Sequence, residues 1–187
     1  MKILRSTCAA LALGLAALSL PALAADSQQP LQTIERLDLQ RYLGTWHEIA
    51  RTPNWFQQKC VGESRAEYSL NPGGTLRVVN RCRLGDGSTN EAIGEARRVG
   101  AADSAQLLVR FAPAWLSWLP MVWGDYWVID LDPEYQLVAV SEPQRKYLWV
   151  LARQPQVDAQ AYAALLGRLK QQGFDLSQLE RSPQSGH

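Results

Sequence analysis

The chain has 187 residues, of which 47% are hydrophobic and 20% are charged, and this length and composition fit one globular domain with a sizeable core. Lysine and arginine number 19 against 18 aspartates and glutamates, so there is no basic excess and we expect no nucleic-acid partner. The chain has only two histidines, His47 and His187. Because a transition-metal site of three or four His and Cys ligands cannot be assembled from these, we expect no metal and no cofactor.

Residues 1–24 have the pattern of a signal peptide. Lys2 and Arg5 precede an apolar run from Cys8 to Leu20, and Ala22-Leu23-Ala24 forms a small-x-small cleavage site. The apolar run, roughly 13 residues, is too short to span a bilayer as a stable helix. The sequence therefore predicts an exported protein.

A lipid anchor is not expected, because Cys8 lies before the apolar run and has no small-residue lipobox ahead of it. The mature protein is therefore not expected to be a lipoprotein. It should comprise an N-terminal extension at residues 25–36, a folded domain with strands and one helix at residues 37–181, and a flexible polar tail at residues 182–187.

Eight short segments carry the alternating or β-rich pattern of strands. They are separated by Gly, Pro, Asp or Asn, and several separators are short hairpin turns that favour antiparallel pairing of neighbours in chain order. The expected strands are Trp46–Arg51, Arg65–Leu70, Thr75–Arg83, Glu91–Arg98, Gln106–Phe111, Tyr126–Leu131, Gln136–Ser141 and Tyr147–Arg153. The pattern predicts an all-β fold, an eight-stranded antiparallel up-and-down barrel.

Two cysteines remain once the signal peptide is removed, Cys60 and Cys82. The turn Asn71–Gly74 folds one expected strand back on the next and so brings these cysteines near each other. In an oxidising compartment we expect them to form a disulfide, which stabilises the fold by ~3 kcal/mol in the chain-entropy model. Two free thiols are the alternative.

The segment between the fifth and sixth expected strands is apolar, although a connection between strands is normally polar. It contains proline at both ends of an aromatic stretch whose candidate contact residues are Trp115, Leu116, Trp118, Leu119 and Trp123. It is too short to cross a membrane. Two interpretations stay open: a lid folded over the barrel rim, or a contact with a membrane surface.

One convincing helix follows the strands. Asp158 is a candidate N-cap, and Gly173 is placed to end the helix. An apolar stripe between them comprises Tyr162, Leu165, Leu166 and Leu169, and it predicts a helix packed on the outside of the barrel.

Three motifs, in order along the chain, resemble the three signatures of the lipocalin family. They are Gly44–Arg51 (GTWHEIAR), Asp130–Tyr135 (DLDPEY) and Leu148–Arg153 (LWVLAR). Together with the segment Leu37–Leu43 and the closing helix, they resemble in particular the bacterial lipocalins similar to apolipoprotein D. The resemblance covers about Leu37 to Leu179 and implies a carrier of one small apolar molecule.

The resemblance also implies structural roles for Gly44, Trp46 and Arg153. In the family the first-strand Trp plugs the closed end of the barrel and the last-strand Arg lies across it. An Arg on a Trp face is a favourable cation–π pair, worth about 0.5–2 kcal/mol. We expect Trp46 and Arg153 to stabilise the fold and not to contact the ligand.

The two-residue period of strands sorts the inward from the outward side chains, starting from an inward Trp46. The residues expected to line a ligand cavity are Ala50, Ala66, Tyr68, Val78, Asn80, Val109, Phe111, Tyr126, Val128, Ala139, Ser141, Tyr147 and Trp149. Such a lining suits an acyl chain, with tyrosine hydroxyls, Ser141 or Asn80 available to a carboxylate or phosphate head group. The alternative is that the same side chains fill a solid core.

Glu48 shares the inward face, where a carboxylate is costly unless it is hydrogen-bonded or protonated. We expect it to bond to a tyrosine near the base of the barrel. No partner acid, base or nucleophile lies at a matching position, and the chain contains no Gly-x-Ser-x-Gly motif and no P-loop, so we expect no enzymatic activity.

The resemblance to the bacterial lipocalins implies a periplasmic carrier of a fatty acid or lysophospholipid. A peripheral membrane contact, at the periphery of the outer membrane, is a further hypothesis. Two alternatives are a lipocalin-fold enzyme acting on a lipid or isoprenoid, and a structural envelope protein that docks through its aromatic segment. The sequence leaves open whether the protein is a monomer or a homodimer.

Overall fold

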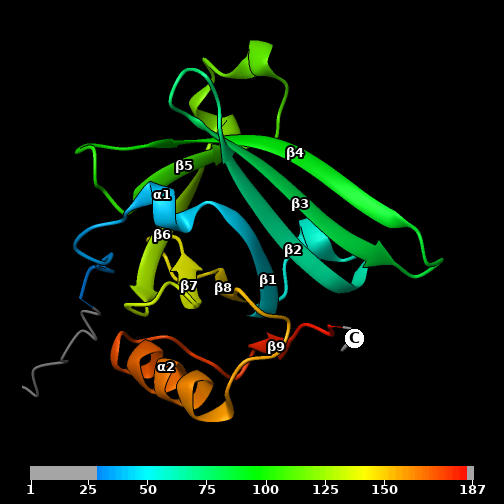
Figure 1. The fold of residues 1–187 in the computed structure, drawn as a ribbon, viewed down its shortest axis with the longest axis vertical. Helices are drawn as coiled ribbons and strands as arrows, with labels where there is room; N and C mark the ends of the chain where they lie inside the picture. Colours follow the sequence, from blue (N-terminus) through cyan, green and yellow to red (C-terminus); the bar gives the residue numbers. More distant parts are fainter. Residues whose placement is uncertain (1–28, 185–187) are drawn as a thin grey trace, which may run out of the picture.

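A computed structural model describes residues 29–184. The expected signal peptide and Cys8 lie outside the described residues. Eight strands of a nine-stranded antiparallel sheet pair in chain order. The first, β1 (Gly44–Arg51), pairs with both the second, β2 (Cys60–Leu70), and the eighth, β8 (Leu148–Ala152). The sheet is therefore closed, and the predicted eight-stranded up-and-down barrel with a C-terminal helix is confirmed (Figure 1).

The strands agree closely with the predicted segments. Their bounds are β1 (Gly44–Arg51), β2 (Cys60–Leu70), β3 (Leu76–Leu84), β4 (Thr89–Arg98), β5 (Gln106–Arg110), β6 (Gly124–Leu131), β7 (Leu137–Ser141) and β8 (Leu148–Ala152). The remaining elements are the helices α1 (Leu39–Tyr42) and α2 (Ala159–Gln171), the short 3-10 helices η1 (Trp55–Gln57), η2 (Ala114–Leu116) and η3 (Pro120–Val122), and the edge strand β9 (Glu180–Arg181).

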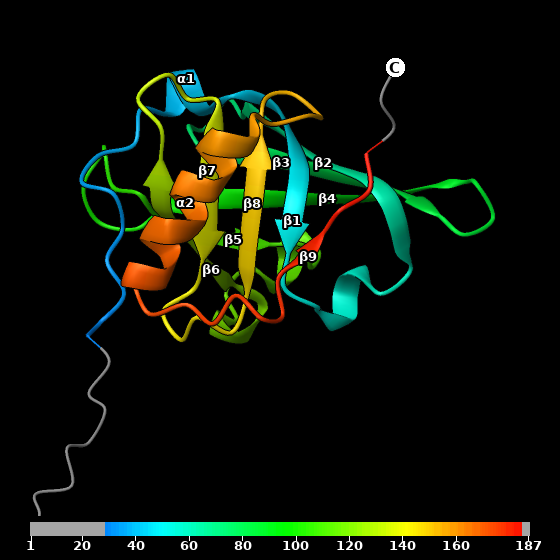
Figure 2. The same ribbon diagram turned by 90° about the horizontal axis from the view of Figure 1, so that it is seen from below.

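Helix α2 packs on the outer surface of the barrel, where it lies across β7 and β8 (Figure 2). The Asp158 carboxylate accepts a hydrogen bond from the Ala161 backbone N–H at 2.8 Å and so caps the helix. Gly173, with φ +84°, reverses the chain after the last turn. Leu165 and Leu169 are fully buried against the barrel wall, as the apolar stripe predicted.

Both ends of the domain are attached to the barrel more firmly than the sequence predicted. In the expected extension, Leu31 is buried and the Ile34 N–H donates to the Val128 carbonyl at 2.9 Å. The expected flexible tail is wrong for residues 182–184: the Ser182 N–H donates to the Ile49 carbonyl, and the Gln184 amide donates to the Glu48 carbonyl. These bonds continue the pairing of β9 with β1.

Cys60 and Cys82 form a disulfide, as predicted, with their Cα atoms 5.6 Å apart. It joins the first residue of β2 to β3. Because β2 begins beside the β1–β2 loop, the bond secures that end of the barrel.

The other end of the barrel is closed by Trp46, which is completely buried. The Arg153 guanidinium lies 3.9 Å from the centre of the Trp46 ring and donates to the carbonyls of Thr45 and Tyr135 at 3.0 and 3.2 Å. Gly44 has φ +92°, a conformation that L side chains rarely adopt, and this turn brings the chain from α1 into β1 beneath Arg153. The closed end is thus a stack of one indole and one guanidinium fixed to the backbone.

Replacing Arg153 by Ala should lower the free energy of unfolding by about 1–3 kcal/mol, because it removes the cation–π contact with Trp46 and the hydrogen bonds to the carbonyls of Thr45 and Tyr135. Urea denaturation measures the change. Arg153→Lys keeps the charge but not the planar group. Its free energy of unfolding should lie between those of the parent and Arg153→Ala. Equal unfolding midpoints for the parent and Arg153→Ala would contradict this role.

Candidate functional site

The barrel holds an internal cavity of about 740 Å³, within the range of small-molecule sites. Its base lies above Trp46, and it opens at the opposite end between the loops that carry η1 and η3 and the β7–β8 loop. Every barrel strand except β7 contributes to its wall. The alternative of a solid core is therefore wrong.

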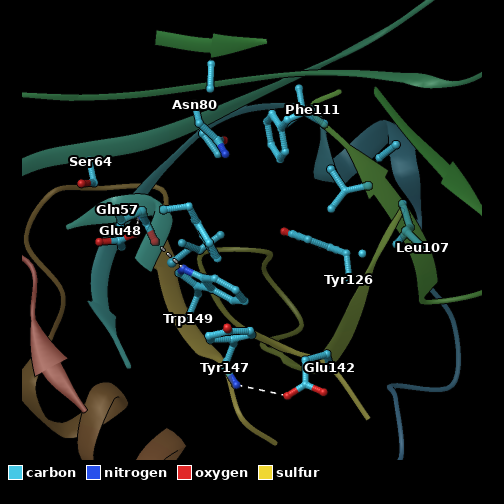
Figure 3. Close-up of a pocket in the computed structure, with 18 of the residues that line it drawn as sticks. Glu48, Gln57, Ser64, Asn80, Leu107, Phe111, Tyr126, Glu142, Tyr147 and Trp149 are labelled. Carbon is cyan, nitrogen blue, oxygen red and sulfur yellow. Dashed lines mark hydrogen bonds between the residues drawn. The ribbon is translucent and has the colours of Figure 1, made fainter. Parts of the chain in front are cut away.

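Most of the residues expected to line the cavity do so. They are Ala66, Tyr68, Val78, Asn80, Val109, Phe111, Tyr126, Tyr147 and Trp149. Figure 3 shows Asn80 and Phe111 on one side of the space and Tyr147 and Trp149 on another, with Tyr126 reaching into it.

The expected lining is wrong for Ala50, which packs toward α2. The pairing of β1 with β8 shifts by one residue between Glu48 and Ala50, so a β-bulge at Ile49 reverses the direction of the residues after it. Beyond the bulge Arg51, not Ala50, lies opposite the cavity residue Trp149.

Ala139 and Ser141 also lie on the outer, helix-facing side of the barrel. Val140 pairs with the cavity residue Trp149, so it is the even-numbered residues of β7 that face inward. All five residues of β7 are buried, because its outer face is covered by α2. A strand buried on both faces has no alternation to read, and this is why the predicted parity was wrong.

Val128 does face the barrel interior, but it is fully buried in the packed core and does not line the cavity. Ser141 donates to the Tyr147 carbonyl at 2.6 Å and so fixes the β7–β8 loop instead of facing a ligand.

Several wall residues were missed by the parity argument because they come from outside the expected strands. Tyr42 comes from α1, and Trp55, Phe56 and Gln57 come from η1 in the β1–β2 loop. The Asn54 side chain caps η1 by accepting from the Gln57 N–H at 2.9 Å. An Asn followed by two adjacent aromatic residues was the available signal for this short helix.

A polar network crosses one side of the cavity wall and centres on Glu48, whose exposure is 4%. Its Oε1 accepts from Arg51 and Ser182 at 2.5 Å each, and its Oε2 accepts from Gln57 at 2.7 Å. The expected tyrosine partner is wrong. Gln57 in turn accepts from the Trp149 indole N–H at 3.0 Å, so the buried carboxylate fixes the positions of η1 and Trp149.

An aromatic group lies near the mouth. The ring centres of Phe56, Tyr147 and Trp149 lie 5.9–6.2 Å apart, a separation typical of favourable aromatic pairs. They give the upper wall a rigid apolar surface.

A second aromatic group, the tyrosine triad Tyr42, Tyr68 and Tyr126, lies at the base. The Tyr126 hydroxyl oxygen is 2.7 Å from that of Tyr42 and 2.8 Å from that of Tyr68. Burial raises the pKa of Tyr68 to about 12 and raises the pKa values of Tyr42 and Tyr126. The hydroxyls are therefore neutral throughout the physiological range, and they are not placed to bind a head group at the mouth.

These raised pKa values predict alkaline destabilisation. A tyrosine in the unfolded chain loses its proton near pH ~10, whereas the folded protein holds the Tyr68 proton until its pKa of about 12. The stabilisation is complete below pH ~10 and should be lost as the pH rises above it. Urea midpoints measured across this range should fall less steeply for Tyr68→Phe than for the parent. Tyr162→Phe on α2 is the control, and identical slopes for all three proteins would refute the assignment.

The aromatic segment between β5 and β6 lines the cavity only near its ends, through Phe111, Ala112 and Val122. Trp115, Trp118 and Met121 are 73%, 75% and 84% exposed and are not part of the cavity wall. Trp123 contacts the guanidinium groups of Arg97 and Arg110, which lie 4.5 and 5.2 Å from its ring centre, and this holds the base of the segment. Leu116 and Leu119 are half-buried. The segment thus presents two indoles to solvent beside the mouth.

In the part of the chain that the structure describes, no helix is long and apolar enough to span a bilayer, and no three His, Cys, Asp or Glu residues are grouped as metal ligands. A barrel closed at one end, with an apolar cavity open at the other, is the architecture of proteins that enclose a small hydrophobic molecule.

The sequence comparisons agree with this class. Residues 37–184 match the family model described as a lipocalin-like domain. The chain is 38% identical over 160 residues to temperature-induced lipocalin-1 of Arabidopsis thaliana, covering 84% of this chain and 85% of that protein. It is 36% identical over 145 residues to the outer membrane lipoprotein Blc of Escherichia coli (strain K12), covering 77% of each. The protein belongs to the lipocalin family.

Two further comparisons give lower identities. Mouse apolipoprotein D is 29% identical over 158 residues, covering 81% of this chain and 79% of that protein. Insecticyanin from the tobacco hornworm Manduca sexta superposes with a TM-score of 0.65 at 18% identity, covering 83% of this chain and 85% of that one. At that identity the likeness shows the fold alone.

Proposed function

We propose that the protein is a periplasmic carrier that holds one long-chain lipid, a fatty acid or lysophospholipid, in its barrel. The observation that carries the proposal is the apolar cavity of about 740 Å³, closed at its base and open at the mouth. The names of its relatives, a bacterial outer membrane lipoprotein and an apolipoprotein, support a role in handling lipids in the cell envelope. The expected signal peptide supports export.

The energetics are adequate for a carrier. Burying ~15 methylene groups at ~0.8 kcal/mol each gives roughly 12 kcal/mol, from which the cost of association and of ordering the chain must be subtracted. An affinity in the micromolar to nanomolar range remains. A carrier returns its ligand unchanged, so incubation with extracted envelope lipids should yield no new product by mass spectrometry; turnover would favour the enzyme alternative.

Trp149→Asp should weaken binding of a fluorescent fatty acid by about a hundredfold or more, because it removes an indole from the wall and places a carboxylate close to Glu48. Ile93→Asp is the matched control, since Ile93 is 52% exposed on β4 and lies outside the cavity wall. Fluorescence titration measures both affinities, and circular dichroism checks the fold. If folded Trp149→Asp binds as tightly as the parent, the cavity is not the binding site.

We also propose that the mouth contacts a lipid surface through the segment 111–123, which contains no charged residue. Exposed indoles favour the head-group region of a bilayer. Trp115→Ser combined with Trp118→Ser should therefore weaken association with phospholipid vesicles by a few kcal/mol and remove the blue shift of Trp emission. Flotation with vesicles measures the partitioning.

The control for this test is Ile93→Ser combined with Val99→Ser, which removes two exposed apolar side chains from β4 and the turn after it. The control should float like the parent. If the parent itself does not float, or the double indole variant floats equally well, the membrane contact is refuted.

A further inference from the structure

The tyrosine triad has three hydroxyl hydrogens but only two hydrogen bonds between its members. Each tyrosine hydroxyl donates one hydrogen, and the triad has only two oxygen–oxygen contacts, at 2.7 and 2.8 Å. No other described residue forms a hydrogen bond with these hydroxyls. Whichever way the two bonds run, one of the three O–H groups has no acceptor within the described protein.

When Tyr42 and Tyr68 both donate to Tyr126, the hydroxyl hydrogen of Tyr126 has no acceptor within the triad. Its oxygen contacts both neighbours and can accept from both, which leaves its own hydrogen free. Tyr42 and Tyr68 are 1% and 5% exposed, whereas Tyr126 is only half-buried. Figure 3 shows its hydroxyl end directed into the middle of the cavity. A ligand that fills the cavity therefore meets this donor first.

The surroundings of the triad decide which kind of acceptor fits. The side chains packed around it are apolar, among them Leu76, Val78 and Leu107. An acyl chain ending in a methyl group would exclude water from the Tyr126 donor without replacing the hydrogen bond, which is unfavourable. A ligand with an oxygen atom at its inner end would satisfy the donor.

The acceptor should be neutral. The cationic residues of the wall are Arg65, Arg81 and Lys146; Arg65 lies three residues from Tyr68 along β2, about 10 Å in a strand, and Lys146 is in the β7–β8 loop at the mouth. Arg153 is occupied by Trp46 and by backbone carbonyls. A carboxylate at the triad would be buried without a counter-charge, which costs far more than burying a carbonyl.

We propose that the base of the cavity is a subsite for a neutral oxygen acceptor, a ketone, ether or hydroxyl group, carried at the inner end of an otherwise apolar ligand and bound by the Tyr126 hydroxyl. The proposal rests on the carrier function proposed above and narrows its ligands to oxygenated lipids.

The test compares stearic acid with a series of keto-stearic acids whose carbonyl is moved along the distal half of the chain. The isomer whose carbonyl reaches Tyr126 should bind the parent protein about tenfold more tightly than stearic acid, the ratio given by about 1.4 kcal/mol. Tyr126→Phe alone would leave the hydroxyls of Tyr42 and Tyr68 without their partner and free to donate, so all three tyrosines are replaced by Phe together. In this triple variant the preference should disappear while stearic acid still binds. Tyr162→Phe on the outer helix should keep the preference.

A spectroscopic measurement keeps the proposal testable if the triple variant fails to fold. The carbonyl of the preferred, isotope-labelled ketone should absorb at lower infrared frequency in the parent than in an apolar solvent, because it accepts a hydrogen bond. Equal affinities for all isomers, or an unshifted carbonyl band, would overturn the subsite. Absence of stearic acid binding would instead contradict the carrier function itself.

Discussion

The closed end of the barrel is the constraint on which the rest of the structure depends. Trp46 occupies the interior where the strands converge, and Arg153 covers it from outside with its donors committed to backbone carbonyls. Without this stack, water could enter from both ends and the apolar wall would line a channel. With it, the space above becomes a cup with a dry base and one entrance.

Above that base, the polar network around Glu48 is the second constraint on the cavity wall. The Glu48 network lies along one wall and joins β1 to η1 and to the C-terminal segment. Both oxygens of the buried carboxylate accept hydrogen bonds, which makes its burial tolerable, and through Gln57 it orients Trp149. The cavity wall, the β1–β2 loop and the end of the domain are therefore parts of one connected arrangement.

The sequence predicted the strands, the helix and the disulfide because each rests on local chemistry: alternation, turn residues, an Asp cap and a terminating Gly. It also predicted the cavity residues of β2, β3 and β5, whose pattern is regular. It failed at Ala50 and at Ala139 for different reasons. A bulge at Ile49 depends on how β1 meets β8, which is a property of the assembled barrel, and β7 lost its alternation because α2 covers its outer face.

The pairing of β1 with β8 has a consequence for how the molecule is made. His47 lies opposite Ala152, so the seam that closes the barrel joins residues about a hundred positions apart, and contacts of such long sequence separation form slowly. The stack of Trp46 and Arg153 spans the same seam. A chain emerging from a ribosome or crossing a membrane would have an open sheet with exposed apolar side chains until nearly the whole chain had emerged. Late closure of this kind suits a polypeptide that must remain unfolded in transit and acquire its shape at its destination.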